Sequence, residues 1–239
     1  MRDVLERAGV KPQGVHVQMQ GADRPALPTV PLFTRSIPIA KALHPDTLLA
    51  FEMNGRPLPL LHGAPLRVIT PGWMAESCMK WLTELTVRAD ETPGYYMQQA
   101  YRMPETSIQP GSGLPGTVMV PVEQMPVKSL IAAPGEGDTV RKGPVTVQGV
   151  AWAGEFAVAH VEVSCDDGKT WEQARLLGEG QPYAWRQWQY VWTPRTVGPT
   201  ALLCRATDAR GEQQPATSSW NPGGFLWSGW DRVAVTVAA

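Results

Sequence analysis

The chain has 239 residues, and its 21 Lys and Arg against 22 Asp and Glu give a formal net charge of −1 at pH 7. Nucleic acids and anionic membrane surfaces are bound through an excess of basic side chains, so this balance argues against both as partners. No apolar run approaches the roughly 18 residues of a transmembrane helix, and residues 1–5 lack the hydrophobic core of a signal peptide. We therefore expect a soluble chain with two domains of roughly 120 residues each.

The first predicted element is a short amphipathic helix over residues 1–9. Val4, Leu5 and Ala8 fall on one face of it, and the opposite face carries charges. Gly9 follows as a C-terminal stop, because glycine adopts the left-handed conformation that ends many helices.

Two strands are predicted in the first half of the chain. Residues 16–21 alternate polar and apolar side chains and run into a turn at residues 22–25. Residues 48–53 read as a second strand that ends in Asn54-Gly55, which is the strongest short signal for a β-hairpin.

The loop from His62 to Arg67 is the first candidate binding site. Its imidazole and guanidinium are five residues apart across Gly63 and Pro65, so both can point from an irregular backbone toward one oxygen-rich group. Lys80 can add a third donor. A loop of this composition is also an ordinary connection into an apolar strand, so anion binding and a purely structural role are both open.

Residues 111–116 match the glycine pattern of a dinucleotide-binding loop, but we interpret them as a loop near a domain boundary. No strand leads into them, and Pro115 prevents an ordinary helix from starting there.

From residue 140 onward, short alternating runs at regular spacing predict an immunoglobulin-like β-sandwich. The predicted strands are Val145–Val150, His160–Ser164, Arg186–Trp192, Ala201–Ala206 and Val233–Val237. Turns are predicted at residues 166–169 and 208–211. Most of the ten tryptophans lie after residue 150, which places large aromatic side chains in the sandwich core or at an interface.

The three cysteines are too few and too far apart for a disulfide framework or for a zinc or redox pair. Cys165 and Cys204 fall on the inward faces of their predicted strands, so we expect both to be structural.

Two separate stretches resemble a known family. Residues 54–59, 62–73 and 80–82 are similar to the molybdopterin-binding domain of the sulfite oxidase family. Residues 220–224 and 229–233 resemble the end of the dimerisation domain of that family. The resemblance implies a mixed fold, with an incomplete α+β molybdopterin domain at residues 1–122 and an all-β, immunoglobulin-like dimerisation domain at residues 123–239.

The resemblance also implies a molybdenum–molybdopterin cofactor and its binding residues. The pterin and its phosphate would be held by Asp23, His62, Arg67, Cys78, Met79 and Lys80. In the family, the cysteine that ligates molybdenum belongs to a part of the domain that precedes the matching helix, so we expect no metal ligand in this chain.

Tyr101 and Arg232 match the family residues that serve the substrate. A phenol can donate a hydrogen bond to an oxyanion, and a guanidinium supplies two donors to a strongly hydrated anion such as sulfite. Each position also has a structural interpretation: Tyr101 as a packing residue, Arg232 as a surface arginine and Asp23 as a turn cap. Asp231 precedes Arg232 and could partly neutralise it.

The function implied by the resemblance is the two-electron oxidation of sulfite to sulfate, with a cytochrome or similar acceptor. A homodimer through the second domain is expected, and a periplasmic location if the pattern of the full-length bacterial family applies. Sulfane sulfur or nitrate as the substrate remains open. So does a non-catalytic dimerisation or interaction fragment. An incomplete first domain should also expose apolar surface that a complementing chain would cover.

Overall fold

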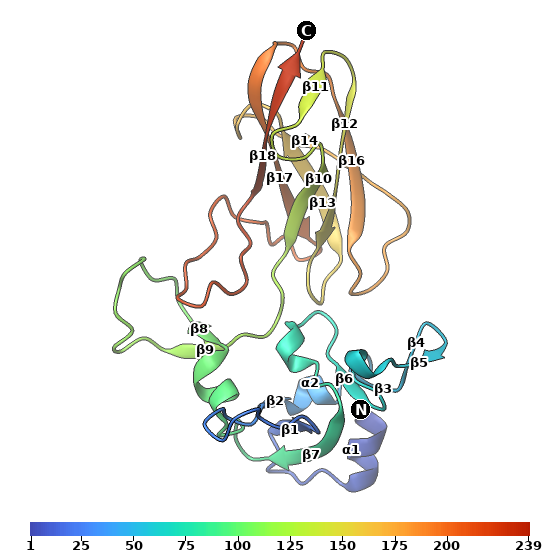
Figure 1. The fold of residues 1–239 in the computed structure, drawn as a ribbon, viewed down its shortest axis with the longest axis vertical. Helices are drawn as coiled ribbons and strands as arrows, with labels where there is room; N and C mark the ends of the chain where they lie inside the picture. Colours follow the sequence, from blue (N-terminus) through green and yellow to red (C-terminus); the bar gives the residue numbers. More distant parts are fainter. The chain divides into compact units, whose positions relative to one another are not determined.

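The computed structural model describes residues 1–239 and is mostly β-structure with a few short helices (Figure 1). It divides into two compact units. The first comprises residues 1–123 and 221–225, and the second comprises residues 124–220 and 226–239. The segment 221–225 therefore groups with the first unit, although the sequence placed it in the second domain. No helix is long and apolar enough to cross a membrane.

The helices of the first unit are all short. They are α1 (Arg2–Ala8), α2 (Ile39–Ala42), two 3₁₀ turns η1 (Leu60–His62) and η2 (Ala75–Ser77), and a π-helical turn η3 (Tyr96–Ala100).

The strands of the first unit form one three-stranded sheet and three two-stranded pairs. They are β1 (His16–Gly21), β2 (Thr34–Pro38), β3 (Leu48–Ala50), β4 (Glu52–Met53), β5 (Arg56–Pro57), β6 (Arg67–Ile69), β7 (Leu82–Arg88), β8 (Arg102–Pro104) and β9 (Met119–Pro121). The sheet has the order β2-β1-β7, and the pairs are β3-β6, β4-β5 and β8-β9.

The core of the first unit lies on one face of the β2-β1-β7 sheet. Val17 and Met19 alternate with half-buried neighbours along β1, and Val17 lies opposite Ile37 of β2. This is the alternation expected of a strand with one face buried. On α1 only Leu5 is buried, and Val4 is 51% exposed. The buried face of this helix is therefore narrower than the apolar face predicted from the sequence.

The strand predicted over residues 48–53 is interrupted at Phe51. Its first part, β3, pairs with β6, and its second part, β4, forms a hairpin with β5. Asn54 and Gly55 have φ values of 53° and 72°, as a tight hairpin turn requires. The hairpin is confirmed, and the single strand is wrong.

The second unit is built from strands only. They are β10 (Lys128–Ala133), β11 (Thr139–Arg141), β12 (Val145–Trp152), β13 (Val158–Ser164), β14 (Glu172–Gln173), β15 (Arg175–Leu176), β16 (Arg186–Trp192), β17 (Gly198–Asp208) and β18 (Asp231–Ala238). Every strand predicted after residue 140 is present. They form a four-stranded sheet, β10-β12-β16-β15, and a five-stranded sheet, β11-β18-β17-β13-β14.

The two sheets share one hydrophobic core to which both contribute buried residues. Trp188 of β16 lies fully buried opposite Gly149 of β12, and a Cβ on Gly149 would lie 2.4 Å from the indole. The glycine therefore makes room for the largest core side chain. Cys204 is buried and Cys165 half-buried, and burial is the main cause that raises the pKa of each thiol to about 12. Both belong to this structural core.

Candidate functional site

The loop between η1 and β6 is closed by Arg67. Its Nη1 donates to the His62 carbonyl at 2.9 Å, and its Nη2 donates to the Cys78 carbonyl at 3.3 Å. The Nε atom of the same guanidinium is buried and makes no hydrogen bond. Arg67 thus joins two chain segments and keeps its buried Nε–H unused.

Lys80 and Trp81 bind the same loop from the other segment. The Lys80 ammonium donates to the Leu61 carbonyl at 3.1 Å and lies 4.4 Å from the centre of the Trp81 ring. The Trp81 indole N–H donates to the Leu60 carbonyl at 2.8 Å. The side chains of Leu60 and Leu61 are 70% and 79% exposed.

Two glycines allow the close approach of these segments. Gly63 has φ +105°, and a Cβ on it would lie 3.0 Å from Lys80 Cβ and 3.2 Å from Arg67 Cβ. A Cβ on Gly21 would lie 2.5 Å from Asp23 Oδ1 and 2.7 Å from the Lys80 carbonyl. Gly21 and Gly63 therefore let Asp23 and the basic loop approach the same stretch of chain.

The Asp23 carboxylate is exposed and makes no hydrogen bond, so the turn cap considered from the sequence is not formed. Cys78 is held by Thr70, whose backbone N–H and hydroxyl lie 3.3 and 3.2 Å from Sγ. The Met79 side chain is buried in the core, while its carbonyl accepts a hydrogen bond from the Val68 N–H. Cys78 and Met79 can therefore serve a ligand mainly through their backbone.

Tyr101 lies outside this loop pair, in an aromatic cluster of the first unit. Its ring centre is 5.8 Å from that of Phe225, 6.3 Å from that of Tyr96 and 6.4 Å from that of Phe33. Its carbonyl accepts a hydrogen bond from the Val122 N–H at 2.9 Å. Tyr101 follows directly after η3, and π-helical turns often occur at functional sites.

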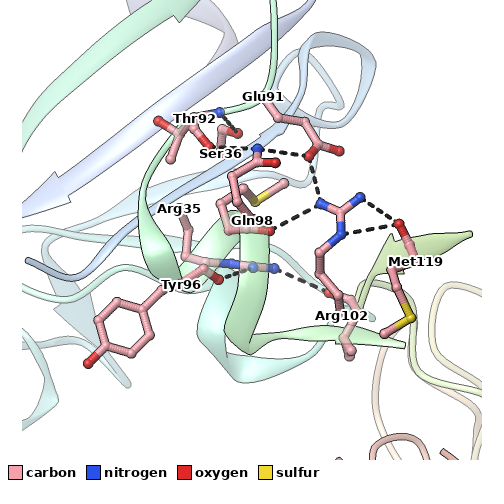
Figure 2. Close-up of polar contacts among 10 residues, drawn as sticks. Arg35, Ser36, Glu91, Thr92, Tyr96, Gln98, Arg102 and Met119 are labelled. Atoms are coloured by element: carbon pink, nitrogen blue, oxygen red, sulfur yellow. Dashed lines mark hydrogen bonds and ion pairs between the residues drawn. The ribbon is translucent and has the colours of Figure 1, made fainter. Parts of the chain in front are cut away.

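Arg35 of β2 lies beneath this cluster and is only 1% exposed. Its Nη1 donates to the Tyr96 carbonyl at 2.6 Å, and its Nη2 donates to the Val122 carbonyl at 3.3 Å and lies 3.6 Å from Glu76 Oε1. Burial is the main cause that lowers the pKa of Arg35 and raises the pKa of Glu76. Figure 2 shows the Arg35 guanidinium reaching the main chain at Tyr96.

A second arginine, Arg102, binds the next carbonyl of the π-helical turn, that of Met97 (Figure 2). Its Nη1 donates to Glu91 at 2.7 Å and to the Met97 carbonyl at 3.1 Å, and its Nη2 donates to the Met119 carbonyl at 2.7 Å. Arg102 thereby ties η3 to the β8-β9 pair.

Arg232 lies on β18 of the second unit and is 56% exposed. Its Nε lies 3.4 Å from Asp167 Oδ1, in the turn after β13. The Asp231 carboxylate instead accepts a hydrogen bond from the Ile131 N–H at 2.8 Å. The expected neutralising partner is thus corrected: it is Asp167, because Asp231 is engaged by the backbone of β10.

The structure joins Arg67 to the carbonyls of His62 and Cys78, and Lys80 donates to Leu61 of the same loop. Asp23 lies beside this pair of segments, next to Gly21. Tyr101 and Arg232 lie in other clusters. The sequence analysis assigned no role to Arg35, Glu76 or Trp81. A usable signal was present for Arg35, because it shares a strand face with the buried Ile37, where a charged side chain is unexpected.

Two family models match the chain in order. The oxidoreductase molybdopterin binding domain matches residues 1–96, and the Mo-co oxidoreductase dimerisation domain matches residues 120–238. Among solved structures, the sulfane dehydrogenase SoxCD from Paracoccus pantotrophus superposes with a TM-score of 0.81 at 27% identity, over 99% of this chain and 60% of that chain.

Curated relatives include the mitochondrial sulfite oxidase of Macaca fascicularis, 38% identical over 99% of this chain and 45% of that protein. The sulfite oxidase of Arabidopsis thaliana is 31% identical over 98% of this chain and 64% of its own length. A nitrate reductase of Hordeum vulgare is 28% identical over 99% of this chain and 29% of its own length. The chain spans about half the length of the mammalian sulfite oxidases that it matches. With both domain models matched in order, this chain belongs to the sulfite oxidase family of molybdenum oxidoreductases.

Proposed function

We propose that this chain supplies the cofactor-phosphate and substrate-facing groups of a molybdopterin oxidoreductase that oxidises sulfite to sulfate. The observation that carries the proposal is the hydrogen-bonded pairing of the loop at His62 with the segment at Lys80, which Arg67 closes. Basic side chains on an irregular backbone are the groups that proteins use to bind phosphate.

The residues present fit an anionic phosphate group. After closing the loop, Arg67 still has a buried Nε donor with no partner, which a bound anion can satisfy. Gly63 keeps open the space beside Lys80 and Arg67 that a Cβ would crowd. His62 is exposed next to both.

The molybdenum–molybdopterin cofactor, when bound, supplies two-electron oxidation with transfer of an oxygen atom. His62, Arg67 and Lys80 would hold its phosphate, and the free carboxylate of Asp23 would accept hydrogen bonds from the pterin. Cys78 and Met79 would contribute backbone groups.

We infer that the thiolate ligand of molybdenum is none of the three cysteines described above. Metal binding requires the deprotonated thiol, and burial raises the pKa of Cys165 and Cys204 to about 12. Cys78 is engaged by two groups of Thr70. Ligation would therefore fall to a residue outside this set.

Tyr101 and Arg232 would serve the substrate. Sulfite is a small and strongly hydrated anion, so its binding requires fixed donors that replace water. The Tyr101 hydroxyl can donate one hydrogen bond, and the Arg232 guanidinium can donate two once it leaves Asp167. Electrons would then pass to a cytochrome-type acceptor. Nitrate and sulfane sulfur are alternative substrates, because similar proteins are named as a nitrate reductase and a sulfane dehydrogenase.

The second unit would form a homodimer. An immunoglobulin-like sandwich for this unit is supported by its sheet orders, β10-β12-β16-β15 and β11-β18-β17-β13-β14. When the short edge strands β11 and β14 are set aside, the first, second, fifth and fourth strands form one sheet and the third, sixth and seventh form the other, as in that fold. The match to a dimerisation domain supports this assignment.

A non-catalytic interaction fragment is the second candidate. Phe51, Leu60 and Leu61 are exposed beside the basic loop, and an apolar surface of this kind favours a covering polypeptide.

The test is the molybdenum and pterin content of the purified chain after expression in a host that makes the cofactor. We expect both in the wild-type chain, and about a tenfold lower content in Arg67→Met, because a charge-assisted donor is removed. Arg56→Met is the matched control, since Arg56 is exposed on β5 outside the loop pair. A wild-type chain without metal and pterin would contradict the proposal and favour the non-catalytic fragment.

A further inference from the structure

Arg35 is a buried cation that has no role in the cofactor or substrate binding proposed above. At 1% exposure it cannot meet a dissolved substrate, and its carboxylate partner Glu76 is 6% exposed. Buried ion pairs are often no more stable than apolar replacements, since removing both charges from water is unfavourable. Stability alone is therefore a weak reason for this pair.

The contacts of Arg35 are grouped around Tyr101. One branch of the guanidinium binds the carbonyl of Tyr96, the first residue of the π-helical turn that leads into Tyr101. The other branch binds the carbonyl of Val122, whose own N–H donates to the Tyr101 carbonyl. The carbon at the centre of the fork lies 5.5 Å from the centre of the Tyr101 ring.

We propose that Arg35 is a positioning residue for Tyr101. It fixes Tyr101 through its two main-chain hydrogen bonds and through its contact with the face of the ring. Its ion pair with Glu76 connects Tyr101 to the segment of Cys78. The inference rests on the proposed substrate role of Tyr101 and deepens it. A phenol that must donate to a small oxyanion has to be held to within a fraction of an ångström, which the fork achieves through groups that do not touch the substrate.

The chemistry of arginine suits this task. Its planar fork binds two carbonyls at once and can stack on an aromatic face, whereas a lysine would offer a single point charge. Glu76 belongs to η2, two residues before Cys78, and β2 packs against η2. A shift of the cofactor segment would therefore be transmitted to the Tyr101 cluster through one ion pair.

The experiment compares the buried Arg35 with the half-buried Arg102 of the same region. Arg35→Met combined with Glu76→Gln removes the fork without leaving an unpaired buried carboxylate, which protects folding. Arg102→Met is the matched control, because Arg102 also binds main-chain carbonyls around η3, at Met97 and Met119, rather than the Tyr101 ring. Intact nuclear Overhauser contacts between β1 and β7 verify the fold of each variant.

The first readout needs neither cofactor nor turnover. Nuclear Overhauser contacts from the Tyr101 ring to the rings of Phe225 and Phe33 report its position in the chain as purified. We expect them in the wild type and in Arg102→Met, and their loss in the Arg35→Met, Glu76→Gln variant. Their retention in that variant would overturn the inference, whatever the enzyme does.

The second readout is sulfite oxidation by chain loaded with cofactor. We expect the double variant to lower kcat/KM about 10- to 100-fold, as for a group that orients a reacting side chain. Adding Tyr101→Phe should then lower it by less than about threefold more, whereas Tyr101→Phe and Arg102→Met should combine multiplicatively. Unchanged kcat/KM despite lost ring contacts would overturn the role in the reaction. If the wild type binds no molybdenum, the proposed function fails, and the ring contacts still decide whether Arg35 positions Tyr101.

Discussion

At the scale of single residues, the basic side chains of the first unit divide their donors between the protein and a prospective ligand. Arg67 and Lys80 each donate to main-chain carbonyls, which fixes the loop before any anion arrives and leaves further N–H groups for a ligand. Arg35 binds carbonyls and a buried carboxylate, which fixes Tyr101. In our proposal, arginine thus serves as a ligand-binding group at Arg67 and as a scaffold at Arg35, and burial distinguishes the two.

The buried carboxyl of Glu76 makes stability depend on pH. Its pKa is raised from the ordinary 4.5, chiefly by burial, so the unfolded chain releases this proton at lower pH than the folded chain does. The stabilising contribution is complete below pH 4.5 and is lost as pH rises through the folded-state pKa. We expect the free energy of unfolding of the wild type to fall relative to Glu76→Gln over this range, measured by urea titration at successive pH values. A relative rise would mean that attraction to Arg35 outweighs burial.

At the scale of elements, turn geometry determines which segments can approach. The β3-β6 and β4-β5 pairs are short. The basic loop and residues 78–81 are held together by side chains that reach across in both directions rather than by a long strand pairing. Gly63 has to satisfy two demands, a positive φ and the absence of a Cβ, whereas Gly55 in the hairpin turn has to satisfy only the first.

Substitution of these two glycines should separate the two demands. Gly55→Ala should destabilise the chain by about 1 kcal/mol through the left-handed backbone alone. Gly63→Ala should cost about 2 to 3 kcal/mol, because its Cβ also presses on Lys80 and Arg67. Urea unfolding measures both. An equal loss of unfolding free energy in both variants would show that Lys80 and Arg67 can move aside to accommodate the added Cβ.

At the scale of the whole molecule, the chain returns to the first unit after building most of the second. Residues 221–225 belong to the first unit, and Asn221 closes this segment by donating to the Phe225 carbonyl and accepting from the Phe225 N–H. Phe225 then contributes a ring to the Tyr101 cluster. The first unit is therefore completed by residues far along the sequence.

Removal of this ring should destabilise the first unit only. Phe225→Ala is expected to lower its stability by about 2 kcal/mol, from lost packing and one aromatic pair. Hydrogen exchange of peptides from β1 and β7 should accelerate up to about 30-fold, while peptides from β16 remain unchanged. Trp227→Ala, an exposed neighbour in the second unit, should leave all of them unchanged. Equal acceleration in β16 would show that the two units unfold together.

Local patterns were sufficient for much of this molecule. Alternation predicted the five strands proposed after residue 140, because most of them bury one face; β17 differs, since Ala201 to Cys204 are all buried. The Asn54-Gly55 turn followed from the φ values that those residues tolerate. The loop from His62 to Arg67 was found from residue types and spacing, since both groups lie in one short segment.

Features that depend on partners far away in the sequence could not be predicted from such local patterns. The break at Phe51 arises because β3 and β4 pair with different strands, which neither the pattern of apolar residues nor their spacing indicates. The partner of Arg232 was assigned to its neighbour Asp231, but the β10 backbone occupies that carboxylate and Asp167 takes its place. The role of Arg35 depends on Glu76 and Val122 meeting it in space. Side-chain periodicity is a property of one segment, whereas burial of a charge and closure of an aromatic cluster depend on which segments the fold brings together.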